Sequence, residues 1–126
     1  MLFRSLVFLG VGDGTFLAGP IISLGPARKI RLADVTGNGW LDLVAVPSAR
    51  NSSNDVGVFP GNGDGIFGPP AAFTTCSLVQ DVSIVDLNGD GAIDLAVLDR
   101  EKLNVFLATP IPLSVEIGRA SCRERV

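Results

Sequence analysis

The chain has 126 residues, enough for one small domain, and its 13 acidic and 10 basic residues give a net charge of −3. This charge disfavours nucleic acid as a partner, because nucleic-acid-binding proteins present a basic surface. The absence of histidine disfavours most zinc sites and the usual general-base chemistry. The two cysteines are too few for a disulfide framework. No apolar run is long enough to span a membrane.

Short apolar segments bounded by Gly, Asn and Asp follow one another along the chain, which is typical of β-strands. In chain order the expected strands are 6–10, 28–34, 41–46, 56–61, 82–86, 93–98 and 103–108. The Gly-Asp-Gly sequences at 12–14 and 63–65 suit hairpin turns that need positive φ. No segment predicts a helix of ten residues, so we expect an all-β protein.

The chain repeats itself at an interval of 51 to 52 residues. GVGDGTF at 10–16 recurs as GNGDGIF at 61–67, and DVTGNGWLD at 34–42 recurs as DLNGDGAID at 86–94. Four short strands in a unit of this length are typical of a propeller blade. We therefore expect about two four-stranded antiparallel blades of a β-propeller, present as an incomplete fragment.

Both motifs, in this fixed order, resemble the FG-GAP/VCBS repeats of integrin-α-like β-propellers, and the resemblance covers residues 6 to about 108. It implies that the Asp-rich loops join the first two strands of each blade and bind calcium. It also implies a secreted or cell-surface protein that serves adhesion, or the recognition of a protein or glycan. No sequence feature names the ligand.

The repeat predicts four parts of the chain. Residues 1–27 are expected to end a preceding blade, and residues 28–75 to form the first blade, with its calcium loop at 34–42. Residues 76–115 are expected to form a second, incomplete blade, with its calcium loop at 86–94. Residues 116–126, EIGRASCRERV, resemble the translation of a sequencing adapter, so we exclude them from the fold. We expect further blades in the full-length chain.

The Asp-rich loops have the spacing of a calcium site. Calcium takes six to eight oxygen ligands, and a tightly wound loop supplies them from alternate positions. The expected ligands of the second loop are Asp86, Asn88, Asp90, the carbonyl of Ala92, and Asp94. Those of the first loop are Asp34, Thr36, Asn38, the carbonyl of Trp40, and Asp42. With three carboxylates against two, the second loop is expected to bind calcium more tightly.

Two other interpretations of the loops were weighed. An EF-hand is disfavoured because its twelfth position requires a glutamate, whereas the loops have Ala45 and Val97 there. The loops could instead be simple Asn-Gly and Asp-Gly turns without a metal. For the single aspartates Asp13 and Asp64 the simple turn is the preferred interpretation. Trp40 is expected to cover its hairpin, with an exposed contact residue as the alternative.

These features predict a calcium-binding, non-enzymatic module. Without histidine no Ser/His/Asp or Cys/His set is possible, and the aspartates are better explained as ligands. Two alternatives stay open. One is a lectin-like propeller that binds sugars, and the other is an accessory propeller of a larger secreted enzyme.

Overall fold

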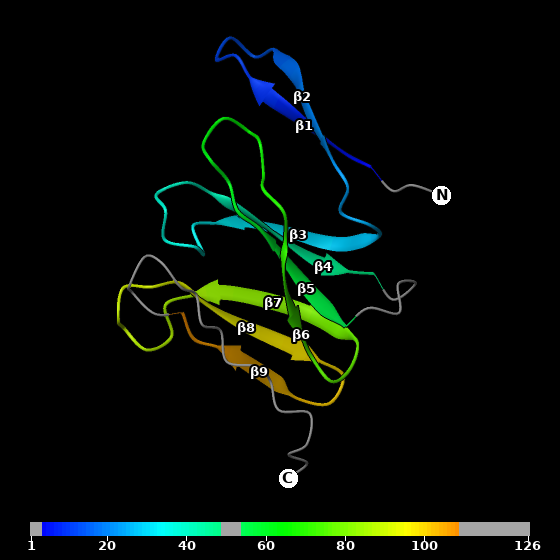
Figure 1. Ribbon diagram of the computed structural model, residues 1–126, viewed down its shortest axis with the longest axis vertical. Helices are drawn as coiled ribbons and strands as arrows, with labels where there is room; N and C mark the ends of the chain where they lie inside the picture. Colours follow the sequence, from blue (N-terminus) through cyan, green and yellow to red (C-terminus); the bar gives the residue numbers. More distant parts are fainter. Residues whose placement is uncertain (1–3, 49–53, 109–126) are drawn as a thin grey trace.

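Antiparallel β-sheets make up the computed structural model of the protein, which describes residues 4–48 and 54–108 (Figure 1). Over these residues there are nine strands and no helix, which confirms the expected all-β fold. None of the described segments is a helix able to cross a membrane. The strands form three sheets of two, four and three strands, consistent with propeller blades in a fragment.

The first sheet is the hairpin of β1 (Ser5–Gly10) and β2 (Phe16–Ile22), drawn in blue at the top of Figure 1. The second sheet contains, in spatial order, β3 (Ala27–Ala33), β4 (Asp42–Pro47), β5 (Asp55–Phe59) and β6 (Ala71–Thr74). The third contains β7 (Val79–Val85), β8 (Asp94–Asp99) and β9 (Leu103–Phe106). Every sheet is a simple meander in which neighbours in sequence pair.

The second and third sheets repeat each other in detail. The pairing Ala33↔Asp42 at the end of β3 recurs as Val85↔Asp94 at the end of β7. Each of these two hairpins also has a register shift at its other end, between Ala27 and Lys29 or between Val79 and Asp81. Residues 52 positions apart in the sequence therefore occupy equivalent positions in the two sheets.

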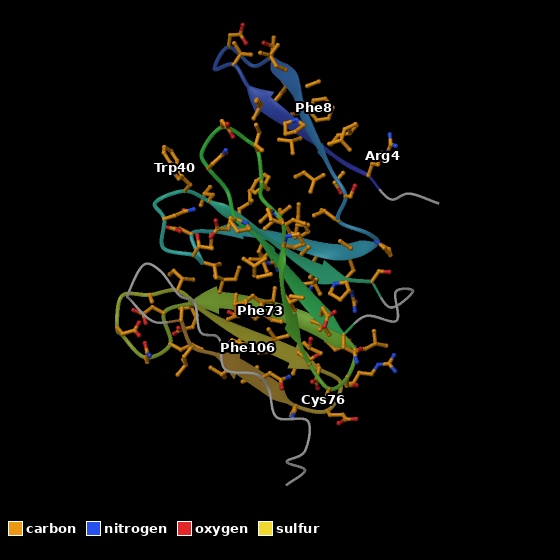
Figure 2. The ribbon with its side chains drawn as sticks, in the orientation of Figure 1. Arg4, Phe8, Trp40, Phe73, Cys76 and Phe106 are labelled. Atoms are coloured by element: carbon orange, nitrogen blue, oxygen red, sulfur yellow. The ribbon has the colours of Figure 1, made fainter. Side chains whose placement is uncertain are left out.

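The main core lies between the second and third sheets. Valines of β4 and β5 face residues of β7, β8 and β9 across this interface, and Phe73 and Phe106 pack with their ring centroids 5.7 Å apart (Figure 2). The buried members of this core are Val35, Val44, Val46, Val56, Val58, Val79, Val82, Leu95, Val97 and Phe106. Since β4 contributes apolar side chains to both of its faces, it is buried along its whole length.

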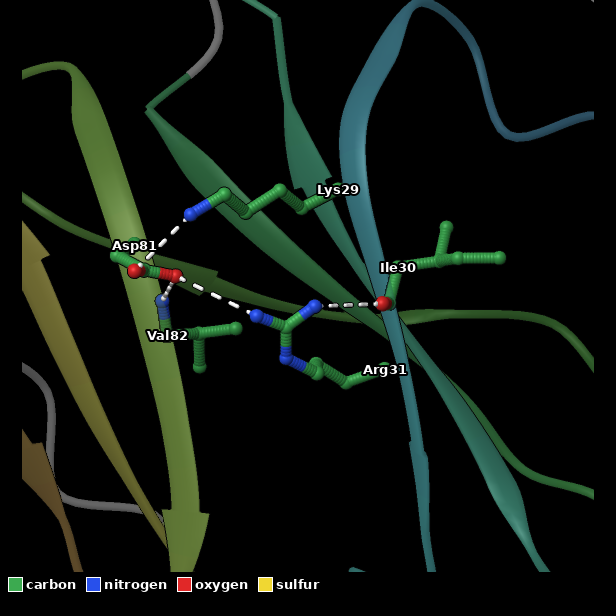
Figure 3. Close-up of polar contacts among 5 residues, drawn as sticks. All are labelled: Lys29, Ile30, Arg31, Asp81 and Val82. Atoms are coloured by element: carbon green, nitrogen blue, oxygen red, sulfur yellow. Dashed lines mark hydrogen bonds and ion pairs between the residues drawn. The ribbon is translucent and has the colours of Figure 1, made fainter.

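An ion pair connects the first strands of these two sheets. Figure 3 shows Lys29 and Arg31 of β3 reaching the carboxylate of Asp81 in β7, with N···O distances of 3.0 and 3.9 Å. The hydrogen bond from Lys29, followed by that from the Val82 amide, lowers the pKa of Asp81 below its ordinary value of 3.8. All three side chains are partly exposed, so the pair adds little to stability.

The smaller hydrophobic cluster lies on the opposite face of the second sheet. Leu43, Ala45 and Phe59 are buried there, with Ile22 and Leu24 packed against them. This cluster connects the segment that includes and follows β2 to the second sheet. Cys76, which follows β6, is half-buried.

Replacing Phe106 by alanine tests the core between the second and third sheets. Phe106 is fully buried, so we expect Phe106→Ala to lower the free energy of unfolding by about 3–5 kcal/mol through lost burial and the cavity left behind. Its neighbour Val105 is exposed, and Val105→Ala should change that free energy by less than about 0.5 kcal/mol. Urea denaturation of both variants measures the difference; equal losses would contradict this assignment of faces.

The Asp81 ion pair predicts a pH dependence. Because the folded-state pKa of Asp81 is lowered, its stabilising effect is complete above the ordinary value of 3.8 and is lost as the pH falls through the lowered value. The unfolding midpoint of the unmodified chain should therefore exceed that of Asp81→Asn slightly at neutral pH and converge with it in acid. High salt should produce the same convergence at neutral pH. A difference that persists in acid and in salt would show that Asp81 acts through packing instead.

Candidate functional site

The two Asp-rich loops occupy equivalent positions at the same end of neighbouring sheets. Residues 34–41 connect β3 to β4, and residues 86–93 connect β7 to β8; both loops lie at the left of the view in Figure 1. The sequence predicted that such loops join the first two strands of a sheet, and each does so. Each loop therefore brings its five predicted ligand positions to one hairpin end.

The first aspartate of each loop organises the turn by accepting hydrogen bonds from backbone amides. Asp34 accepts from Asn38 at 3.1 Å and from Gly39 at 2.9 Å. Asp86 accepts from Gly89 at 2.8 Å, Asp90 at 3.2 Å and Gly91 at 2.9 Å. The loop winds around this carboxylate because its glycines adopt positive φ, a conformation that costs little without a Cβ atom.

The last aspartates of the two loops are completely buried, Asp42 and Asp94 each having 0% exposure. One oxygen of each accepts a backbone N–H from its own loop, that of Thr36 or of Leu87, at 2.8 Å. The other accepts an N–H at 2.9 Å from just beyond the third strand of the same sheet, that of Gly61 or Ala108. A buried carboxylate needs such partners, and here they tie the loop to the end of the third strand.

The middle positions differ between the loops. In the second loop, the exposed Asn88 and Asp90 bond to each other, Nδ2 of Asn88 donating to Oδ2 of Asp90 at 3.1 Å. Oδ1 of Asp90 accepts from the N–H of Ala92, which is half-buried. In the first loop, the amide of Asn38 instead donates to the carbonyl of Gly61 at 2.9 Å. The hydroxyl of Thr36 is buried and has no hydrogen-bond partner.

The donor atoms of both loops are of the type that calcium prefers, namely carboxylate, amide, hydroxyl and carbonyl oxygens. In the described part of the chain, however, no three acidic or cysteine side chains converge closely enough to hold a metal. The loop carboxylates accept hydrogen bonds from amides instead. An oxygen that accepts one hydrogen bond retains a second lone pair, so these bonds leave coordination capacity in the second loop. No lysine or arginine forms an ion pair with either loop among the described residues.

The turn at 61–65 contributes to the first loop, a role that sequence reasoning missed. A Cβ atom on Gly61 would lie 1.9 Å from the carbonyl oxygen of Leu41, and one on Gly63 would lie 2.3 Å from the indole of Trp40. The Gly-x-Gly pattern therefore serves close contacts as well as positive φ. The repeat of this pattern in the sequence was the available signal, but it did not reveal which segment approaches the glycines.

Trp40 contacts a turn outside its own loop and is at the same time largely exposed. Its indole ring lies against Gly63 and so covers the 61–65 turn, while the residue remains 52% exposed (Figure 2). The single aspartates Asp13 and Asp64 each accept the amide two residues later, from Thr15 and Ile66, as turn-forming aspartates do.

A comparison with models of known protein families shows which family the repeat belongs to. The model of the FG-GAP-like repeat matches residues 34–97, which is half of the chain. The chain belongs to the FG-GAP-like repeat family. The match begins at Asp34 and ends in β8, so it contains both Asp-rich loops of the repeat. No curated protein and no solved structure gives a significant match.

Alanine substitutions at two glycines test the contact between Trp40 and the 61–65 turn. Gly63 and Gly37 both have positive φ, 93° and 73°, so alanine strains the backbone at either position. Only at Gly63 would the new Cβ also collide with Trp40, since nothing lies within 4 Å of the corresponding position at Gly37. We expect Gly37→Ala to lower the free energy of unfolding by about 1 kcal/mol or more and Gly63→Ala to lower it further. Thermal unfolding measures both; equal losses would contradict the packed position of Trp40.

Proposed function

We propose that this chain is a calcium-responsive, non-enzymatic binding module, one part of a β-propeller in a secreted or cell-surface protein. In this proposal calcium stiffens the β7–β8 hairpin, and the loop-bearing end of the propeller presents a surface for adhesion, or for recognition of a protein or glycan. Membership of the FG-GAP-like repeat family supports the propeller, and the chemistry of the second loop supports the cation.

The observation that carries the proposal is the concentration of carboxylates in the second loop. Asp86, Asp90 and Asp94 lie within nine residues, and no basic side chain among the described residues pairs with them. Like charges in one short loop repel one another, and a bound cation would offset that repulsion. Asp90 is exposed and its Oδ2 is bonded only to the equally exposed amide of Asn88, so these two side chains can turn toward a cation.

A weak site suffices for this function. Calcium sites of extracellular modules have dissociation constants on the order of 10⁻⁴–10⁻³ M, and a cation that binds only the folded state stabilises that state. The response would be concentrated in the hairpin, because Asp94 connects the loop to the N–H of Ala108 at the end of the third strand. Calcium would thus order the loop and that strand end together.

Equivalent side chains in the two large sheets support the presence of further blades. Val82 and Ile84 of β7 pack against the preceding sheet, and Val82 is only 4% exposed. Their equivalents in β3, Ile30 and Leu32, are 52% and 55% exposed. Two further strands paired to the free edge of β1 would cover this face, since β5, the equivalent of β1, pairs with strands on both sides.

Calorimetric titration of the chain with calcium tests the proposed function. Saturable binding is expected for the unmodified chain and should be lost in the double variant Asp86→Ala/Asp90→Ala. The matched control is Asp13→Ala/Asp64→Ala, which removes two exposed aspartates outside the loops and should leave binding unchanged. Circular dichroism establishes that each variant is folded. Absence of binding by the folded, unmodified chain, or equal binding by the loop variant, would overturn the calcium proposal.

A further inference from the structure

The first loop is closed by three contacts with the 61–65 turn, two of which depend on side chains that the second loop does not have. Gly61, which follows β5, has both of its backbone polar groups bound by side chains of residues 34–42. Its N–H donates to Oδ1 of Asp42 at 2.9 Å, and its carbonyl accepts from Nδ2 of Asn38 at 2.9 Å. Two positions predicted to bind calcium therefore hold the backbone of this turn.

The indole of Trp40 adds a third contact to the same turn. The positive φ of Gly63 and its missing Cβ allow the ring to lie directly against the backbone. A tryptophan buries a large area in such a contact even when half of it stays exposed. Asn38, Trp40 and Asp42 together thus attach the loop to the 61–65 turn from alternate positions.

Among the residues described up to 108, the second loop makes one contact equivalent to these three. Asp94 bonds to the N–H of Ala108 as Asp42 bonds to that of Gly61. Asp90 stands where the first loop has Asn38, and a carboxylate cannot donate a hydrogen bond to a carbonyl. Ala92 stands where the first loop has Trp40 and has no ring to pack.

We propose that the first loop, residues 34–42, is a clamp closed by protein contacts that does not take up calcium. The response of the second loop to calcium rests on the function proposed above, whereas the clamp stands independently of it. Two side chains, Asn38 and Trp40, make the difference between two loops of the same repeat.

The bonds of Asn38 leave its amide poorly suited to a cation. Its Oδ1 accepts the N–H of Trp40 at 2.8 Å while its Nδ2 holds Gly61, so moving the side chain toward a cation would break the clamp. Asn38 also brings no charge, which leaves only Asp34 and Asp42 as carboxylates in the first loop, against three in the second. In the clamp, neutral N–H donors rather than a cation thus offset the charge of the loop carboxylates.

Thr36 offers a separate test of the same inference. Its hydroxyl oxygen is buried without a partner, whereas a calcium ligand would gain one when the metal binds. If no cation enters, Thr36→Val removes an unsatisfied polar group and should leave thermal stability unchanged or raised, with or without calcium. A stability loss that appears only when calcium is present would identify Thr36 as a ligand and overturn the clamp.

The decisive experiment exchanges the middle residues of the loops, using Asn38→Asp and Asp90→Asn in the full chain. Amide resonances of Gly37 and Gly39 report on the first loop, and those of Gly89 and Gly91 on the second, during titration with calcium chloride. In the unmodified chain only the second pair should shift. Asn38→Asp removes the bond from Nδ2 to the Gly61 carbonyl and so loosens the turn. Hydrogen exchange at the Gly61 amide, which itself donates to Asp42, should therefore speed up in EDTA by about two- to tenfold, the scale of one ordinary hydrogen bond. Asp90→Asn should abolish the shifts of Gly89 and Gly91 without altering exchange at Gly61.

Each outcome bears on one proposal. Saturable shifts of Gly37 and Gly39 in the unmodified chain would overturn the clamp, as would unchanged Gly61 exchange in Asn38→Asp. If neither loop responds to calcium but Asn38→Asp speeds Gly61 exchange, the clamp stands and the calcium proposal fails. The two substitutions interchange an amide and a carboxylate of the same shape, in opposite directions, at exposed positions, so the fold is retained for the comparison.

Discussion

The architecture of both large sheets depends on a carboxylate that is buried where two hairpins meet. Asp42 and Asp94 each bridge the N–H of their own loop and an N–H beyond the third strand. A buried carboxylate is costly unless its oxygens are hydrogen-bonded, so both donors must be held in place. This requirement fixes the loop, the second strand and the end of the third strand relative to one another, in both sheets.

Around this common bridge, the two loops have diverged in how they are stabilised. The first contains side chains that donate to or pack on the 61–65 turn, and the second contains an additional carboxylate at an exposed position. A repeat protein can vary in this way because each unit needs only its bridge and its sheet contacts to fold. In the proposed function, one rigid loop stands beside one loop that responds to calcium.

An apolar interface joins the second and third sheets, and the outer face of the third sheet also carries apolar side chains. The valines of β4 and β5 cover β7–β9, while Leu103 and Val105 of β9, which follow the same alternation, are exposed. The ion pair between Lys29 and Asp81 also bridges the first strands of the two sheets, but it contributes little energy. In the proposed propeller, equivalent units would pack against such exposed faces.

The sequence by itself determined the all-β fold, the repeat and the place of both Asp-rich loops, because strand alternation, glycine turns and spacing are local properties of the chain. It did not single out β2 and β6, whose exposed residues do not follow a clear alternation. Only the tertiary structure decided what the loop residues contact. Asn38 resembles a ligand in sequence but bonds to Gly61, 23 residues away, and such a contact depends on how the strands pair.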